Sequence, residues 1–253
     1  LIAARAAGYD TEVSYPDSQE YVRVKLEPDF PQPESLFKSI PLRQNTRSKY
    51  DGRLVGTEDF ARLHAVPLEP GVSLSFASTP DRLAVATDAV YSGTMQQYAE
   101  QVFLEELIVW LRFTRKEAMK TGDGLFSRCS GNPEVPRWLG KRVVAGMKPQ
   151  QQAQADADKM RSSAGAVVIA SQADDPAAWV RTGQVYERLA LTLTSLGIQS
   201  ALLNQPIEVA GLRGEFQSAM GMGDALPQLL VRYGYGPALP RSLAKLEQNY
   251  RDK

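Results

Sequence analysis

The sequence predicts an α+β fold in which helices wrap an antiparallel or mixed sheet. Three observations support this. Strand-like and helix-like segments alternate along the chain. The run from Ala166 to Ala170 is continuously apolar, which is typical of a central strand buried on both faces. Between Met95 and Thr114, apolar residues recur at helical spacing, which predicts one long helix.

The first 34 residues predict a short unit that precedes the main fold. They contain the end of an apolar-striped helix, a glycine stop at Gly8 and two strands, near residues 11–13 and 21–26. Residues 27–34 hold three prolines and are predicted to be a linker. We therefore divide the chain into residues 1–34 and residues 35–253.

The next segments predict short elements. Residues 36–50 start a helix or turn, and residues 57–65 form a helix with Thr57 as its N-cap. Residues 72–76 and 82–85 are strand-like. On the long helix that follows, Trp110 is expected in the core rather than against a ligand.

Residues 122–159 lack the helical or strand periodicity of the preceding segments. The stretch is rich in glycine and proline and ends in a polar run, so it predicts a lid, a binding loop or a disordered insertion. Trp138 could lie across a bound ligand, or it could merely fasten a surface loop to the core. Both interpretations stay open.

The last third of the chain predicts a helix followed by strands. Asp174, Asp175 and Pro176 mark a helix start, since acidic residues and a first-turn proline are favoured there. The helix ends near Gly197, and strands follow at residues 200–203 and 229–233. Helix, glycine and strand thus recur around Gly8 and Gly197. This recurrence suggests a duplicated unit, although the same order is common in α/β proteins.

Composition limits the possible functions. The 253 residues are 43% hydrophobic and 23% charged, as in ordinary globular proteins. Because 29 basic and 29 acidic residues cancel, neither nucleic acid nor an anionic membrane is expected as the main partner. No apolar run is long enough to predict a membrane span. With His64 and Cys129 as the only residues of their kinds, we expect no internal disulfide, no Cys/His zinc site and no metal ligands.

Two basic segments suit a phosphate group. Arg43, Asn45 and Arg47 lie near the start of the main unit, and Arg241 lies near its end. A guanidinium offers a rigid fork of donors that matches phosphate oxygens. The alternative is that these arginines are solvated surface charges.

These segments resemble the FMN-dependent nitroreductase superfamily, and most closely its Acg-like branch. The likeness rests on Arg43-x-Asn45-x-Arg47 followed by Tyr50, on the run from Asn204 to Glu208, and on the terminal Pro240-Arg241. In this family the first segment opens a helix, and its polar residues hold the flavin phosphate and ribityl chain. The resemblance implies an FMN site formed by Arg43, Asn45, Arg47, Gln205, Pro206, Ile207, Glu208 and Arg241.

The resemblance also implies an architecture. Acg-like proteins resemble a nitroreductase dimer fused into one chain, with a lid over the flavin. Residues 1–34 would then be the remnant of a first half, residues 35–253 a nearly whole second half, and residues 122–159 the lid. The family's Asn-Thr-Gln-Pro-Trp-type flavin loop is missing from these residues, so we expect it to precede Leu1, as any export signal would. The compartment stays open between cytoplasm and periplasm.

The implied function is that of an FMN-dependent oxidoreductase, which reduces a nitro-aromatic or quinone-like acceptor with NAD(P)H or another reductant. The chemistry would belong to the flavin, so no catalytic side chain is assigned. Two alternatives remain: a protein that sequesters FMN under a closed lid, and a degenerate scaffold without flavin. A homo-oligomer is also expected, because a nitroreductase site needs two halves.

Overall fold

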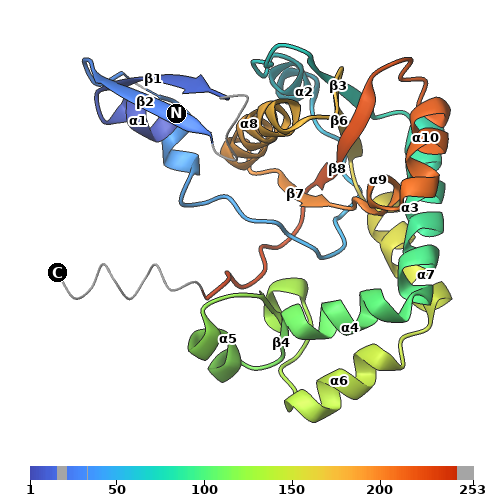
Figure 1. The fold of residues 1–253 in the computed structure, drawn as a ribbon. Helices are drawn as coiled ribbons and strands as arrows, with labels where there is room; N and C mark the ends of the chain where they lie inside the picture. Colours follow the sequence, from blue (N-terminus) through green and yellow to red (C-terminus); the bar gives the residue numbers. More distant parts are fainter. Residues whose placement is uncertain (16–21, 33, 244–253) are drawn as a thin grey trace.

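A computed structural model describes residues 1–15, 22–32 and 34–243 of the chain (Figure 1). Its strands are β1 (Tyr9–Ser14), β2 (Arg23–Pro28), β3 (Val72–Ala77), β4 (Leu111–Arg112), β5 (Leu125–Phe126), β6 (Gly165–Ser171), β7 (Gln199–Leu202) and β8 (Leu226–Gly234). Its helices and 3-10 turns are α1 (Ile2–Ala6), η1 (Phe37–Ser39), α2 (Thr57–His64), α3 (Pro80–Ala99), α4 (Gln101–Trp110), α5 (Arg115–Thr121), η2 (Ser127–Ser130), α6 (Arg137–Ala145), α7 (Pro149–Arg161), α8 (Pro176–Ser195), α9 (Gln205–Glu208) and α10 (Ala210–Ala219).

The main sheet has the strand order β3-β6-β8-β7, and all three neighbouring pairs are antiparallel. Every residue of β6 is buried, as the apolar run from Ala166 to Ala170 predicts. Helix α8 lies on one side of the sheet and α3 and α10 on the other (Figure 1). The predicted α+β fold is confirmed, and its sheet is antiparallel.

Strand β6 supplies both hydrophobic cores. Because side chains alternate across a strand, Val167 and Ile169 join the cluster beneath α2 and α8, whereas Val168 joins Val90 of α3 in the opposite cluster. These side chains are fully buried. Complete burial of a Val, Leu or Ile side chain contributes about 1.5–3 kcal/mol, so the two layers hold the sheet in place from both faces.

Helix starts follow local sequence, with three corrections. The Asp175 carboxylate caps α8 by accepting a 2.8 Å bond from the Ala178 amide, as predicted. The N-cap of α2 is Gly56, and Thr57 is already helical. The strand predicted at residues 82–85 is wrong, because the Thr79 cap and the first-turn Pro80 start α3 before it. The single helix predicted at residues 95–114 is also wrong, since extended backbone at Glu100 separates α3 from α4.

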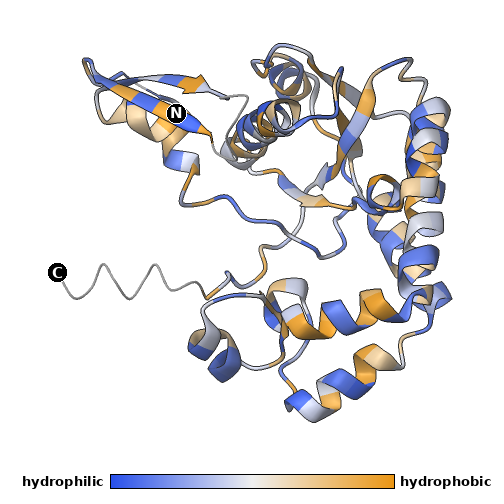
Figure 2. Cartoon of the chain, in the orientation of Figure 1, coloured by the Kyte–Doolittle hydropathy of each residue, from blue (hydrophilic) through white to orange (hydrophobic). Residues whose placement is uncertain are grey.

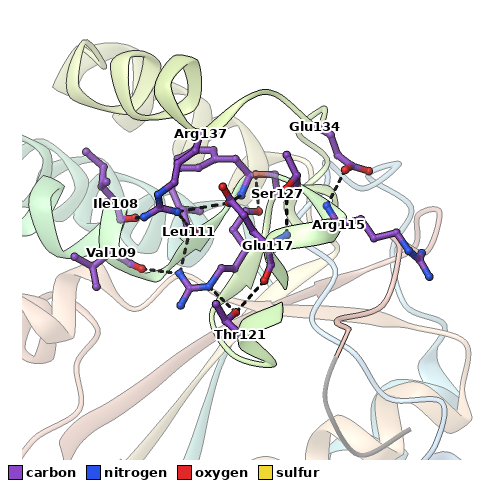
Figure 3. A network of polar contacts seen from close by, with 12 residues as sticks. Ile108, Val109, Leu111, Arg115, Glu117, Thr121, Ser127, Glu134 and Arg137 are labelled. Atoms are coloured by element: carbon purple, nitrogen blue, oxygen red, sulfur yellow. Dashed lines mark hydrogen bonds and ion pairs between the residues drawn. The ribbon is translucent and has the colours of Figure 1, made fainter. Parts of the chain in front are cut away.

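Residues 101–148, which we call the helical arm, lie beyond the ends of α3 and α7 and away from the main sheet (Figure 1). Its elements are joined to one another by polar contacts (Figure 3). Arg137 donates to the carbonyls of Ile108 at 3.4 Å and Leu111 at 3.2 Å, and the Arg115 amide donates to Glu134 at 2.7 Å. The arm is therefore a structured unit and not a loose loop.

The boundaries predicted for the lid, 122–159, differ from those of the arm at both ends. The arm begins at Gln101, and residues 149–159 belong to α7. Buried Ala153, Ala157 and Met160 recur on one side of α7, which packs along α3. The polar run that suggested a loop belongs to this helix, with Gln151 and Gln154 exposed and Asp156 buried.

The arm exposes apolar side chains. Helix α4 has no buried residue, and Trp110, expected in the core, is half exposed together with Trp138 and Val143. Figure 2 shows the apolar stretches along α4 and α6. Among the described helices, none has the combination of length and hydrophobicity that crossing a membrane requires.

The N-terminal unit consists of α1 and a separate antiparallel hairpin, β1-β2. The predicted strand at 21–26 is displaced to Arg23–Pro28, and Tyr21 lies outside the described residues, as does Pro33 of the predicted linker. Gly8 and Gly197 both have left-handed backbone, with φ of 85° and 69°, and each lies between a helix and a strand. The two glycines share this local order, and the duplication stays a prediction.

Candidate functional site

A cavity of about 480 Å³ lies between the main fold and the helical arm. This volume lies within the range typical of small-molecule sites. The main fold supplies one wall from α7, β7 and β8, and the arm supplies another from α4, η2 and α6. The lining residues are Arg47, Tyr98, Leu107, Leu111, Leu125, Ser130, Asn132, Val144, Met147, Gln152, Ala155, Asp156, Lys159, Ala201, Leu202, Leu203, Gln205 and Arg232.

The charged residues of the cavity are Arg47, Lys159 and Arg232, with Asp156 as the single carboxylate. Asp156 is buried and accepts hydrogen bonds from Lys159 at 2.8 Å and from Gln152 at 3.1 Å. Three cations and one anion give the cavity lining a positive net charge. Arg47 has no hydrogen bond or ion pair from its side chain within the described residues. An anionic ligand would therefore meet a donor group that is not already occupied.

Arg232 of β8 is the most unusual member of the wall, because its side chain is fully buried and forms no ion pair in the described part of the chain. One terminal nitrogen, Nη2, donates to the carbonyls of Thr46 at 3.2 Å and Ser48 at 2.7 Å. The guanidinium lies 4.0 Å from the ring centre of Tyr50. Burial raises the pKa of that phenol to about 12, so Tyr50 stays neutral in the physiological range.

Asn45, Arg43 and Arg47 lie around the hydroxyl of Tyr186 on α8. The hydroxyl donates to Asn45 Oδ1 at 3.1 Å. Burial raises the pKa of Tyr186, while the nearby guanidiniums of Arg43 and Arg47 act in the opposite direction. Arg43 also forms a 3.0 Å ion pair with Glu187. The structure therefore places the three predicted residues in one cluster, of which only Arg47 reaches the cavity wall.

The second basic segment lies beside the first. Gln44 Nε2 donates a 3.0 Å hydrogen bond to the Leu239 carbonyl, and the guanidinium of Arg241 donates to the carbonyl of Pro41. The family resemblance implied that the segment from Arg43 to Arg47 opens a helix, and this prediction is wrong. After η1 the segment runs as irregular chain and pairs with β7 through a parallel bridge between Asn45 and Ser200. Pairing with the edge strand replaces helix formation here.

The segment from Asn204 to Glu208 forms the short helix α9, whose side chains point to different places. Asn204 Oδ1 accepts a 2.8 Å bond from the Leu230 amide, which joins this segment to β8. Gln205 reaches the cavity and Pro206 is buried. Ile207 packs in the core on the α3 side, and the exposed Glu208 accepts a 2.8 Å bond from Gln97.

Gly93 of α3 lets α9 approach closely. A Cβ atom at this position would lie 2.8 Å from the backbone of Gln205, which is closer than side-chain packing allows. The side-chain Nε2 of Gln205 donates to Asp156 Oδ2 at 3.4 Å, while the side-chain Oε1 is buried and has no partner among the described residues. The close helix contact thus fixes an unsatisfied acceptor on the cavity wall.

Sequence reasoning missed several polar residues of the cavity, among them Tyr98, Asp156, Lys159 and Arg232. Burial, and to a lesser degree the nearby Asp156, raise the pKa of Tyr98 to about 12. Arg232 had a visible signal, since it is a lone cation in the apolar stretch predicted as the last strand. No group of three or more metal-ligating side chains gathers anywhere in the described ranges.

Comparison with known proteins gives two kinds of similarity. No family model matches the chain. Two curated proteins, from two strains of Mycobacterium tuberculosis, carry the name "Putative NAD(P)H nitroreductase"; each is 24% identical over 246 residues, covering 94% of this chain and 68% of the relative.

Among solved structures, a nitroreductase with bound FMN from Desulfitobacterium hafniense aligns with a TM-score of 0.50 and 12% identity, over 85% of this chain and 97% of that one. An FMN-dependent nitroreductase from Mycobacterium smegmatis in complex with NADPH aligns with a TM-score of 0.49 and 12% identity, over 83% and 94%.

Proposed function

We propose, on the premise that this chain is nitroreductase-like in sequence and in fold, that it is an FMN-dependent oxidoreductase which reduces nitro-aromatic or quinone-like acceptors. One observation supports this most strongly. Arg47 and Gln205 come from the two segments predicted to hold the flavin, and both line the same cavity. The names of the curated relatives agree with this class of reaction.

The residues around the cavity fit FMN. Arg43, Asn45, Arg47 and Arg241 would hold the phosphate and ribityl chain, because their two segments lie side by side. The segment of Gln205, Pro206, Ile207 and Glu208 would face the ring system. There the Oε1 of Gln205, which is buried and has no partner within the described ranges, offers an acceptor to a ligand donor. Ile207 and Glu208 would contribute through backbone, since their side chains pack against the core and Gln97.

The side chains would position the cofactor and the acceptor. FMN, when bound, supplies hydride and electron-pair transfer. Arg47 and Lys159 would favour negative charge at the cavity wall, and the arm residues Leu107, Leu125 and Val144 would exclude water from the opposite side. We assign no catalytic acid or base. NADH or NADPH is the proposed reductant, and the acceptor is a small molecule.

A flavin-sequestering protein is the second candidate function. The observation in its favour is that the arm forms one wall of the cavity, which could keep a nicotinamide away from bound flavin. Visible absorbance of the purified protein would detect flavin and would exclude a flavin-free scaffold. Steady-state oxidation of NADH and NADPH with a nitro-aromatic would then separate the two candidates. Bound flavin without turnover would support sequestration.

We also propose that residues 1–34 and 35–253 descend from two copies of one unit and that the chain forms a homo-oligomer. The first idea is supported by the shared helix, glycine and strand at Gly8 and Gly197. The second is supported by the exposed apolar residues Trp110, Trp138 and Val143 of the arm. Sedimentation velocity over a range of concentrations would test it, and a monomer throughout would contradict it.

A further inference from the structure

Arg232 is fully buried, and none of its direct hydrogen-bond partners in the described chain carries a charge. These partners are the carbonyls of Lys159, Thr46 and Ser48, and the Ser163 hydroxyl at 3.5 Å. Its Nε is buried and has no hydrogen-bond partner in the part of the chain that the structure describes. Buried charges in proteins are normally paired. In the described chain the Asp156 carboxylate of the same cavity acts on Arg232 through space but does not pair with it directly, so an anionic ligand in that cavity would complete its charge pairing.

The contacts of Arg232 also fix the position of Arg47. Thr46 and Ser48, whose carbonyls accept from the same Nη2, are the two neighbours of Arg47 in the chain. Tyr50 strengthens the arrangement, because its ring lies against the guanidinium and its hydroxyl donates to the Thr46 carbonyl at 3.0 Å. The backbone is thus held on both sides of Arg47, whose own side chain makes no described polar contact.

We propose that Arg232 is a positioning residue that holds Arg47 at the cavity, so that the Arg47 guanidinium can bind an anionic phosphate group of the ligand. This inference rests on the proposed function, because the phosphate of FMN is the anion expected there. Lys159 adds positive charge to the same wall, while Asp156 opposes it but is already engaged by Lys159 and Gln152. Asp156 is the one carboxylate that lines the described cavity.

The test is a double-mutant cycle with Arg232→Lys, Arg47→Ala and the combination, in the full chain freed of flavin. Affinities for FMN and riboflavin are measured by fluorescence titration, since riboflavin lacks only the phosphate. We expect each single variant to weaken FMN binding at least about tenfold, with riboflavin changed less than about twofold. The double variant should bind FMN no more than about threefold weaker than Arg47→Ala alone, because both residues act on one group.

Arg161→Ala serves as the matched control, because Arg161 is an exposed arginine at the end of α7 that pairs with Asp158 on the surface. It should retain wild-type preference for FMN. If Arg232→Lys does not fold, Tyr50→Leu removes the ring from the guanidinium while leaving both charges in place, and it should also reduce the preference for FMN. Equal losses for FMN and riboflavin, or fully additive effects of Arg47 and Arg232, would overturn the inference.

Failure of the inference and failure of the proposed function are distinguishable. Wild-type protein that binds FMN, with unchanged preference in Arg232→Lys, would refute the positioning role only. Wild-type protein that binds neither flavin would refute the proposed function. In that case inorganic phosphate becomes the probe, and the inference requires that phosphate raise the melting temperature of the wild type but not of Arg47→Ala. The absence of this shift would refute the anion site as well.

Discussion

The side-chain amide of Gln44 donates a 3.0 Å hydrogen bond to the main-chain carbonyl of Leu239, which lies 195 positions further along the chain. This bond, with the contact between Arg241 and Pro41, holds the two basic segments together. The proposed anion-binding group is thus assembled from distant segments and can form only in the folded state.

Replacing Arg43 or Arg241 by alanine should weaken FMN binding. Each substitution removes a charge-assisted contact of about 1.5–3 kcal/mol, so the affinity should fall at least about tenfold while riboflavin binding stays nearly unchanged. Titration of flavin fluorescence measures both affinities. Arg161→Ala is the control. If FMN and riboflavin lose affinity equally, these arginines do not hold the phosphate.

Glu187→Gln should strengthen FMN binding by a few-fold. The Glu187 carboxylate pairs with Arg43 at 3.0 Å and would compete with a phosphate for the guanidinium. The gain is small because both side chains are partly exposed and screened by solvent. Glu69→Gln, which breaks the pair of Glu69 with Arg188 elsewhere on α8, should have no effect. An unchanged or lower FMN affinity in Glu187→Gln would show that Arg43 is not recruited.

Deleting the helical arm should expose bound flavin without unfolding the main fold. Residues 101–148 separate α3 from α7, and these helices pack along each other, so a short Gly-Ser linker can rejoin them. Iodide should then quench flavin fluorescence more strongly, and NAD(P)H oxidation should rise if access limits turnover. The matched control is the intact chain at the same flavin loading. Unchanged quenching in a folded, flavin-loaded deletion variant would place the arm away from the ring.

Gly93→Ala should damage the site through α9. The added Cβ would lie 2.8 Å from the Gln205 backbone, so α9 must move; overpacking of this kind costs about 1–3 kcal/mol. Both thermal stability and FMN affinity should fall. Gly183→Ala on α8 is the control, because its Cβ would meet no atom within 4 Å and alanine favours helix. Wild-type binding by Gly93→Ala would show that the close approach does not position Gln205.

Asp174 should contribute to stability at neutral pH and lose that contribution in acid. Its hydrogen bonds with Arg213 at 2.7 Å, Trp179 at 2.6 Å and Gln228 at 3.1 Å hold the pKa of the carboxyl well below its usual range. A lowered folded-state pKa stabilises the protein above the unfolded-state pKa, about 3.9, and the effect disappears as the pH falls through the folded value.

Asp174→Asn should therefore reduce the free energy of unfolding at pH 7, by about 1 kcal/mol or less because the pair is partly exposed. The difference from wild type should shrink as the pH falls below about 4. Urea denaturation at several pH values measures it. A constant difference across this range would indicate that the amide acts through packing and not through lost charge.

The elements that the sequence predicts well are those with one dominant local signal. Strand β6 is apolar from Ala166 to Ala170, and α8 begins with an Asp cap and a first-turn proline. The errors arise where local signals compete. Helix α7 looks polar because Met160 is its only large buried apolar residue, the others being Ala153, Ala157 and the charged Asp156. The helix predicted across Glu100 is broken where the chain leaves the main fold for the arm.

The candidate site was predictable only in part, for a related reason. Arg47 and Gln205 lie in recognisable segments, so the sequence indicates them. Asp156 and Lys159 reach the cavity because α7 packs against α3, and Arg232 reaches it through the strand order of the sheet. These are tertiary relationships, which local sequence patterns do not contain.

The bridge between Asn45 and Ser200 pairs the first basic segment with an edge of the main sheet. β7 is an outermost strand of the sheet, and Thr46 adds to the bridge through a 2.9 Å bond from its amide to the Ser200 carbonyl. Unpaired strand edges invite other chains to add on and aggregate. The segment proposed to bind the ligand therefore also shields this margin of the sheet. Loosening the segment would cost solubility as well as affinity.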